Sequence, residues 1–190
     1  MTESLGPLGL LAVFALVTFG SIIPVVPTGP AVSAAAVLAS NQHPWELVLV
    51  LLVGAAGAYV GDVTTYAVLR TAGQPLAQRV GWLNASDPDG TLRRLRTGIE
   101  EHEIRSLLLS RLIPAGRIPV LLAAALGGYP WRRYVSAAVL ATLLWSATYS
   151  LVGILGDTIF PDARIAVVAA VVGAVLITLV GQAVQRHRAR

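Results

Sequence analysis

The sequence predicts an all-α polytopic membrane protein, arranged as an inverted repeat with two opposed re-entrant helical hairpins and about four spanning helices. Three observations favour this fold class. The chain is strongly apolar, with 55% hydrophobic and 13% charged residues and a mean hydropathy of +0.71, which is typical of membrane proteins. Prolines and glycines break its apolar blocks, and the order of features in the first half recurs in the second.

Length and charge narrow the class further. The 190 residues leave room for one transmembrane domain, with half one at about 8–73, a surface amphipathic segment at about 74–105 and half two at about 106–185. The absence of cysteine excludes disulfides and thiol metal sites. All 14 basic residues are arginine, and the pI is near 10.1. Because they gather at the edges of apolar blocks, they indicate orientation and anionic headgroups rather than nucleic acid.

The first half begins with the apolar run Leu8–Ile23, followed by prolines at every third position from Pro24 to Pro30. Each proline removes a backbone donor, so this stretch is not expected to be helical. The next apolar segment, Ala31–Ala39, is too short to span a bilayer. We therefore predict a re-entrant hairpin that enters to the proline tip and returns along the short helix.

Trp45–Leu69 is the clearest spanning helix of the chain. Pro44 and Trp45 open it at the membrane interface, and Arg70 with Gly73 forms its stop signal. The polar stretch that follows, Gln74–Arg105, carries leucines at helical spacing between arginines, which predicts an amphipathic helix on the membrane surface.

The second half repeats this plan. The apolar run Leu107–Leu126 is broken by prolines, and Trp131 opens a helix that extends to about Leu155. A tight loop is expected at Gly156–Asp162 before a last span, Ala163–Val184.

Four features recur in the same order in both halves. Ile-Pro recurs at an offset of 90 residues and the interfacial tryptophan at 86, with short alanine-rich segments between them. Gly61-Asp62 and Gly156-Asp157 then follow in the two long helices. This order predicts a duplication of the two halves.

Arginine positions predict the orientation. With both termini in the cytoplasm, the Trp45 helix returns to the cytoplasm at Arg70, which places eleven of the 14 arginines inside and only Arg164 outside. The first hairpin then enters from outside and the second from inside. Two similar halves that enter from opposite faces make an inverted repeat, the architecture of many secondary transporters.

Arg111 and Arg117 flank Pro114 and Gly116 inside an apolar run. An arginine at the centre of a bilayer helix costs about 2.5–3.5 kcal/mol, so the pair requires an enclosed or water-lined site. On an unbroken helix the two would diverge by about 240°, whereas the break lets them converge. Paired guanidinium forks suit phosphate or carboxylate. In the alternative interpretation, one arginine reaches the cytoplasmic interface and the other pairs with a carboxylate for folding.

Asp62 lies about two-thirds of the way along the Trp45 helix, on one face with Tyr59 and Tyr66. Gly57 and Gly61 are spaced for close approach of a neighbouring helix. Two roles for Asp62 stay open, as counter-ion of a hairpin arginine or as proton carrier. The candidate substrate-binding residues are therefore Arg111, Arg117, Asp62, Tyr66, Pro114 and Gly116, with Asp62 also the proton-coupling candidate.

We expect no catalytic residues, so the chain is expected not to be an enzyme. It has no G-x-S-x-G and no Walker loop, and His102-Glu103 lacks the second histidine of a zinc-peptidase motif. No cofactor or metal is expected. The expected partners are membrane lipids and an anionic lipid phosphate, without nucleic acid, and a homo-oligomer is compatible with the sequence.

Two motifs resemble the signatures of the DedA family, also described as SNARE-associated or VTT-domain membrane proteins. One runs from Arg111-Leu-Ile-Pro114 through Gly116-Arg117 and is followed by Trp131 and Trp145. The other is Gly61-Asp62-x-x-x-Tyr66 with Arg70 and Gly73. The similarity covers about Pro24 to Gly156, most of the chain.

This resemblance implies a multi-pass protein of the bacterial inner membrane with two opposed re-entrant hairpins. It also implies that Arg111 and Arg117 match the family's essential arginine pair, and Asp62 an acidic position. Many members carry an acidic residue in the first hairpin, whereas Pro27-Thr28-Gly29-Pro30 has none here. A mechanism that needs two membrane carboxylates therefore does not carry over directly.

The expected function is membrane transport. The family is associated with moving lipid carriers, so we expect a lipid translocase or flippase for an anionic lipid such as undecaprenyl phosphate or a phospholipid. The alternative is a proton-motive-force-dependent exporter of small solutes, with Asp62 as the proton carrier.

Overall fold

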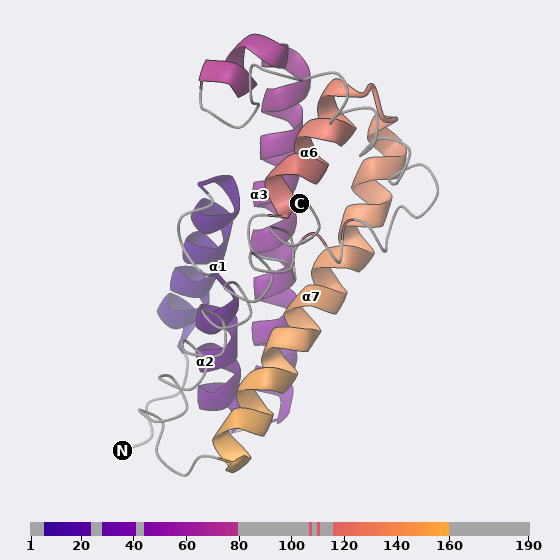
Figure 1. The fold of residues 1–190 in the computed structure, drawn as a ribbon. Coiled ribbons are helices and arrows are strands. Elements are labelled where there is room, and N and C mark those ends of the chain that lie inside the picture. Colours follow the sequence, from indigo (N-terminus) through magenta and orange to yellow (C-terminus); the bar gives the residue numbers. More distant parts are fainter. Residues whose placement is uncertain are drawn as a thin grey trace, which may run out of the picture.

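The part of the chain that the structure describes is all-helical, as predicted (Figure 1). This computed structural model describes residues 6–23, 28–40, 44–79 (side chains to 73), 107, 110 and 116–159. Its helices are α1 (Pro7–Ile22), α2 (Thr28–Ser40), α3 (Pro44–Arg79), α6 (Arg117–Leu126) and α7 (Trp131–Ile159). The predicted surface helix beyond Arg79 and the last span, Ala163–Val184, lie outside the described residues.

Two of the described helices are long and apolar enough to cross a membrane. They are the Pro44–Gly73 part of α3, with 30 residues and a hydropathy of 1.9, and α7, with 29 residues and a hydropathy of 1.8. The helix α1 has 16 residues, which is about 24 Å and less than the roughly 30 Å of a bilayer core. Of the four or so expected spans, the described residues therefore contain two.

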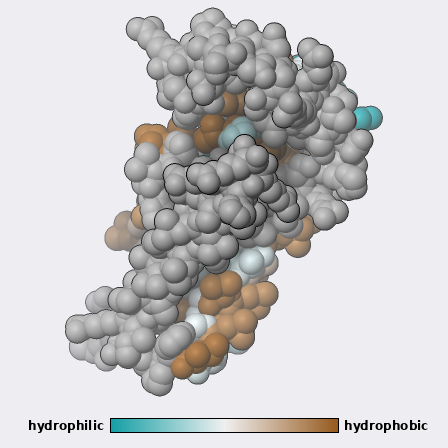
Figure 2. Space-filling model, viewed as in Figure 1, coloured by the Kyte–Doolittle hydropathy of each residue, from teal (hydrophilic) through white to brown (hydrophobic). Residues whose placement is uncertain are grey.

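The surface of this helix bundle is apolar in many places. Leu8 is 81% exposed, Phe19 65% and Leu155 58%, and the coloured part of the lower surface in Figure 2 is mainly hydrophobic. Water would disfavour such a surface, whereas lipid tails solvate it without cost.

Two prolines that were expected to break helices lie inside the first turn of one. Pro30 is the third residue of α2, and Pro119 is the third residue of α6. The prediction of a non-helical tip as far as Pro30 is therefore wrong, and Pro24–Pro27 lies outside the described residues. The physical reason is that the first four N–H groups of a helix have no intrahelical partner, so a proline there removes no hydrogen bond.

The predicted stop of the Trp45 helix is a kink. Gly73 has φ 66°, a left-handed conformation that favours glycine, and helical backbone resumes from there to Arg79. The straight part of α3 therefore ends where the sequence predicted. The predicted loop at Gly156–Asp162 is wrong at its start, because α7 continues through Gly156 and Asp157 to Ile159.

Glycine contacts give the directions of the helices. On α3, a Cβ at Gly57 would meet the Phe14 carbonyl oxygen at 2.9 Å, and one at Gly61 would meet the Cβ of Ser21. The later glycine of α3 contacts the later residue of α1, so α1 and α3 run parallel. By contrast, Gly54 faces Ser146 and Tyr66 stacks on Tyr134, so α3 and α7 run antiparallel.

These directions correct the predicted position of the N-terminal end. The prediction placed both termini at the Arg70 end of the molecule, whereas the start of α1 lies at the end where α3 begins. The physical reason is that α1 turns back through α2 before α3 starts, so α1 enters from the same end as α3. The arginine count is unaffected, because no arginine precedes Arg70.

Each short helix packs against the long helix of the other half of the chain. The helix α2 packs mainly on α7, and α6 packs on α3. At the first of these crossings the Ser33 hydroxyl donates to the Tyr149 carbonyl at 2.7 Å, and the ring of Tyr149 covers Gly29. The backbone of Ser33 in turn lies against Gly153.

The two Gly-Asp pairs, Gly61-Asp62 and Gly156-Asp157, do not occupy equivalent positions in the two long helices. Asp62 lies 17 residues after Trp45, whereas Asp157 lies 26 residues after Trp131. In unbroken helices that difference is about 13 Å of height. The two aspartates therefore occupy different depths, and this pair does not support the duplication.

Two glycines on α7 allow a matched test of the crossing with α2. Gly153→Ala adds a methyl group against the Ser33 backbone, whereas no described residue lies within 4 Å of a Cβ at Gly156. We expect Gly153→Ala to lower the free energy of unfolding by about 1–3 kcal/mol through overpacking. Gly156→Ala should be neutral or stabilising by up to about 1 kcal/mol. Denaturant titration in detergent measures both; equal effects would contradict the described crossing.

Candidate anion-binding site

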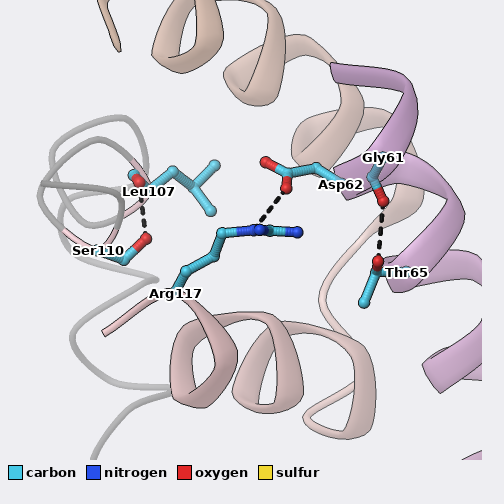
Figure 3. A network of polar contacts seen from close by, with 6 residues as sticks. All are labelled: Gly61, Asp62, Thr65, Leu107, Ser110 and Arg117. Carbon is cyan, nitrogen blue, oxygen red and sulfur yellow. Dashed lines mark hydrogen bonds and ion pairs between the residues drawn. The ribbon is translucent and has the colours of Figure 1, made fainter. Parts of the chain in front are cut away.

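A buried ion pair in the described interior joins α6 to α3. Nε of Arg117 lies 2.8 Å from Oδ1 of Asp62, and the two side chains are 15% and 8% exposed. Figure 3 shows the guanidinium extending from the start of α6 towards Asp62 on α3. The sequence predicted that Asp62 could be the counter-ion of a hairpin arginine, and the structure brings Asp62 and Arg117 together.

Local structure positions each member of this pair. Arg117 is the first residue of α6 and directly follows Gly116, which has φ −71° and ψ −25°. Asp62 follows Gly61, whose missing side chain lets Ser21 of α1 approach. On the same stretch of α3, the Thr65 hydroxyl donates to the Gly61 carbonyl at 2.8 Å. The carboxylate is thus held at a close-packed crossing of α1 and α3.

The electrostatics of this point favour an anion. Two-thirds of the way along the Pro44–Gly73 segment, an arginine is costly unless it is paired. The N-terminus of α6, where Arg117 lies, adds the partial positive charge of the helix dipole. Asp62 supplies the compensating negative charge within the protein. A phosphate or carboxylate group of a ligand would meet the same demand.

Tyr66 was also predicted to bind substrate, and the structure gives it a structural contact. It is fully buried, and its hydroxyl donates to the Tyr129 carbonyl at 2.6 Å. Nη1 of Arg70 donates to the same carbonyl at 2.7 Å and to the Tyr66 hydroxyl at 3.0 Å. The Tyr66 ring stacks on Tyr134 with centroids 3.9 Å apart. These contacts join α3 to the connection between α6 and α7.

Sequence reasoning did not identify this cluster of Tyr66, Arg70, Tyr129 and Tyr134. One signal was present, because Tyr66 and Arg70 are four residues apart and share a helix face. The partners on the other half are 59 and 63 residues away in sequence. No local pattern predicts that contact.

The remaining predicted site residues divide into two groups. Gly116 is described, at the start of α6, whereas Arg111 and Pro114 lie outside the described residues. The convergence of Arg111 with Arg117 therefore stays a prediction. Before the break, Ser110 is buried at 6% exposure, and its hydroxyl donates to the Leu107 carbonyl at 2.7 Å (Figure 3).

A double-mutant cycle tests the Asp62–Arg117 pair. Asp62→Leu leaves the charge of Arg117 uncompensated in the interior, and Arg117→Leu leaves the charge of Asp62 uncompensated. We expect each single substitution to lower the free energy of unfolding by about 3–5 kcal/mol. The double variant removes both charges and should recover most of that loss. Denaturant titration of the four proteins gives the coupling energy, and strictly additive losses would argue against the pair.

A second substitution tests the structural role of Tyr66. Tyr66→Phe keeps the ring stacked on Tyr134 and removes the hydroxyl that donates to the Tyr129 carbonyl and accepts from Arg70, so we expect a loss of about 1–3 kcal/mol in unfolding free energy. Tyr59→Phe, on a half-buried tyrosine of the same helix, is the control. Equal stability of the two variants would show that the Tyr66 hydroxyl contributes nothing.

Comparison with known proteins gives one clear result. The family model described as the VTT domain matches residues 11–155, from α1 to near the end of α7. No curated protein and no solved structure shows a significant match. Because the match covers most of the 190 residues and agrees with the two apolar helices of spanning length, the chain is a membrane protein that belongs to the VTT-domain family of DedA type, as its motifs predicted.

Proposed function

We propose that the chain is a membrane transport protein, a translocase for an anionic lipid such as undecaprenyl phosphate or a phospholipid, and not an enzyme. The observation that carries the proposal is the buried Asp62–Arg117 ion pair. A cation sheltered at membrane depth marks a substrate or ion pathway by default. Arginine also binds phosphate more specifically than a point charge does, because its donors form a planar fork.

Exchange of partners supplies the mechanism. In the empty site Asp62 neutralises Arg117. When a lipid phosphate enters, the guanidinium turns its fork to the phosphate oxygens, and Asp62 is released. The lipid tails stay in the bilayer, so only the headgroup needs a polar path. Arg117 therefore has an anionic partner both in the empty site and in the occupied site.

The inverted repeat and the two opposed re-entrant hairpins belong to this proposal. The helix α2 starts beside Tyr149 and returns towards the end where α3 begins. The helix α6 starts beside Asp62 and returns towards the Tyr66–Tyr129 contact, where α7 begins. The two short helices thus run from the interior towards opposite ends. In transporters, rocking of such halves against each other exposes a central site alternately.

Orientation follows from charge. The end of α3 with Arg70 and the start of α7 with Arg132 and Arg133 form a basic end of the described bundle. By the positive-inside rule this end faces the cytoplasm. In the bacterial inner membrane the second hairpin, with Arg117, would then open towards the cytoplasm.

A second candidate function has one observation in its favour. Asp62 is a carboxylate with 5% exposure inside a membrane-spanning helix, and such residues often carry protons in pumps. A proton-motive-force-dependent exporter of small solutes would use it in this way. Solute flux that follows a pH gradient and is lost in Asp62→Asn would favour this function over lipid transfer.

Reconstituted vesicles test the lipid proposal. Transfer of a fluorescent lipid phosphate between leaflets should fall about 10- to 100-fold in Arg117→Lys. The ammonium group keeps the positive charge but lacks the planar fork of donors, so one charged hydrogen bond of about 1.5–3 kcal/mol is lost. Arg117→Ala should abolish transfer. The control is Arg132→Ala, an exposed arginine on α7, which should transfer lipid at the normal rate. Normal transfer by Arg117→Ala would reject the mechanism.

A further inference from the structure

The helix α6 is attached to α3 at both of its ends. At its start, Nε of Arg117 lies 2.8 Å from Oδ1 of Asp62. Just past its end, the Tyr129 carbonyl accepts hydrogen bonds from the Tyr66 hydroxyl at 2.6 Å and from Nη1 of Arg70 at 2.7 Å. We call this second attachment the carbonyl clamp. Asp62, Tyr66 and Arg70 are spaced four residues apart, so both attachments lie on one face of α3.

The turn after α6 ties the carbonyl clamp directly to the helix. Gly128 has φ 71°, the left-handed conformation that ends many helices. The Tyr129 N–H donates to the Ala124 carbonyl at 3.0 Å, which is the closing bond of a Schellman turn. Tyr129 is therefore bonded back to the last turn of α6 through its N–H and forward to α3 through its carbonyl. The clamp thus holds the end of the helix and not only the loop that follows it.

Burial along α6 differs between its two ends. The five residues from Leu121 to Ala125 are buried, in a cluster that also contains Tyr66. The first turn, residues 117–120, is only half-buried. The end of α6 next to the clamp is therefore the firmly packed one, and the start depends more on the ion pair.

The two attachments also differ in chemistry. The carbonyl clamp uses a neutral acceptor, whereas the start of α6 is held by a carboxylate that another anion can replace. A buried ion pair is favourable only when its geometry is good. Because α6 has 10 residues and is about 15 Å long, a rotation of about 4° about the clamp displaces Arg117 by about 1 Å. The clamp therefore decides how well Arg117 meets its partner.

We propose that Tyr66 and Arg70 are positioning residues of the anion site. By holding the Tyr129 carbonyl they fix the end of α6 and orient Arg117 towards Asp62. The clamp is then the pivot of α6, and the start of the helix is the part that moves when Arg117 changes partner. The pivot rests on the proposed function, whereas the orientation of Arg117 towards Asp62 does not.

Double-mutant cycles in different backgrounds test the positioning role. The coupling energy of Asp62 and Arg117 is measured by denaturant titration of the full chain in detergent, in the wild type, in Arg70→Ala and in Tyr66→Phe. We expect the coupling energy to fall in both variant backgrounds, because the clamp and the ion pair act through the same helix. A clamp that only adds stability would lower the free energy of unfolding equally for all four proteins of a cycle and leave the coupling energy unchanged.

Matched variants control for lost charge and lost hydroxyl. Arg132→Ala removes the charge of an exposed arginine on α7, and Tyr59→Phe removes the hydroxyl of a half-buried tyrosine on α3. Both should leave the coupling energy at the wild-type value. Arg70→Lys can still donate to the same carbonyl and should restore part of the coupling energy. If Arg70→Ala does not fold, Tyr66→Phe, which keeps the aromatic ring, decides the outcome.

Transfer of a fluorescent lipid phosphate in reconstituted vesicles tests the pivot. A displacement of about 1 Å at Arg117 should lower transfer about 10- to 100-fold in Arg70→Ala, and Arg70→Lys should recover part of it. An unchanged coupling energy in Arg70→Ala and Tyr66→Phe would overturn the positioning role, and normal transfer by Arg70→Ala would overturn the pivot. If the wild type transfers no lipid while the coupling energy falls as expected, the proposed function and the pivot fail and the positioning role stands.

Discussion

The buried ion pair between Arg117 and Asp62 is the interaction on which the candidate site depends. It joins the first residue of α6 to the interior of α3, at a depth where neither charge is stable alone. Each residue therefore requires the other, or a ligand that takes its place. Under the proposed function, folding and transport would depend on the same contact, because an anionic headgroup would replace Asp62 as the partner of Arg117.

Close helix contacts make that pairing possible. In lipid, helices gain little from hydrophobic burial against each other, so they associate through small residues that allow close approach. Here Gly57 and Gly61 admit α1, and Gly153 admits α2. The first crossing supports the segment of α3 that carries Asp62. The second sets the short helix of one half against the long helix of the other, as α6 is set against α3.

The polar groups on α3 divide its length into three regions with different chemistry. Glu46 is buried near the start, Asp62 pairs with Arg117 in the interior, and Tyr66 with Arg70 holds the far end to Tyr129. The last of these contacts fixes the end of the helix where the basic residues gather. The first leaves a carboxylate without a described partner. One helix thus carries both the candidate anion site and a set of polar contacts that joins the two halves.

Much of this molecule could be read from local patterns. Apolar length and composition predicted α3 and α7, because a bilayer demands about 20 consecutive apolar residues whatever their neighbours. Interfacial tryptophan and proline predicted where both helices begin, and the motifs predicted the family. Asp62 and Arg117 could be proposed as partners because an isolated charge at that depth is unstable.

Other features depend on contacts between residues far apart in the chain. The Tyr66–Tyr129 joint and the burial of Glu46 arise where α3 meets other helices, and no spacing along the sequence encodes these meetings. The direction of α1 reversed the predicted side of the N-terminal end, since hydropathy measures how far a segment can reach into lipid and not from which face it enters. The predictions at Pro30 and Pro119 were wrong for a similar reason. Whether a proline breaks a helix depends on its position relative to the first turn, and packing decides where that turn begins.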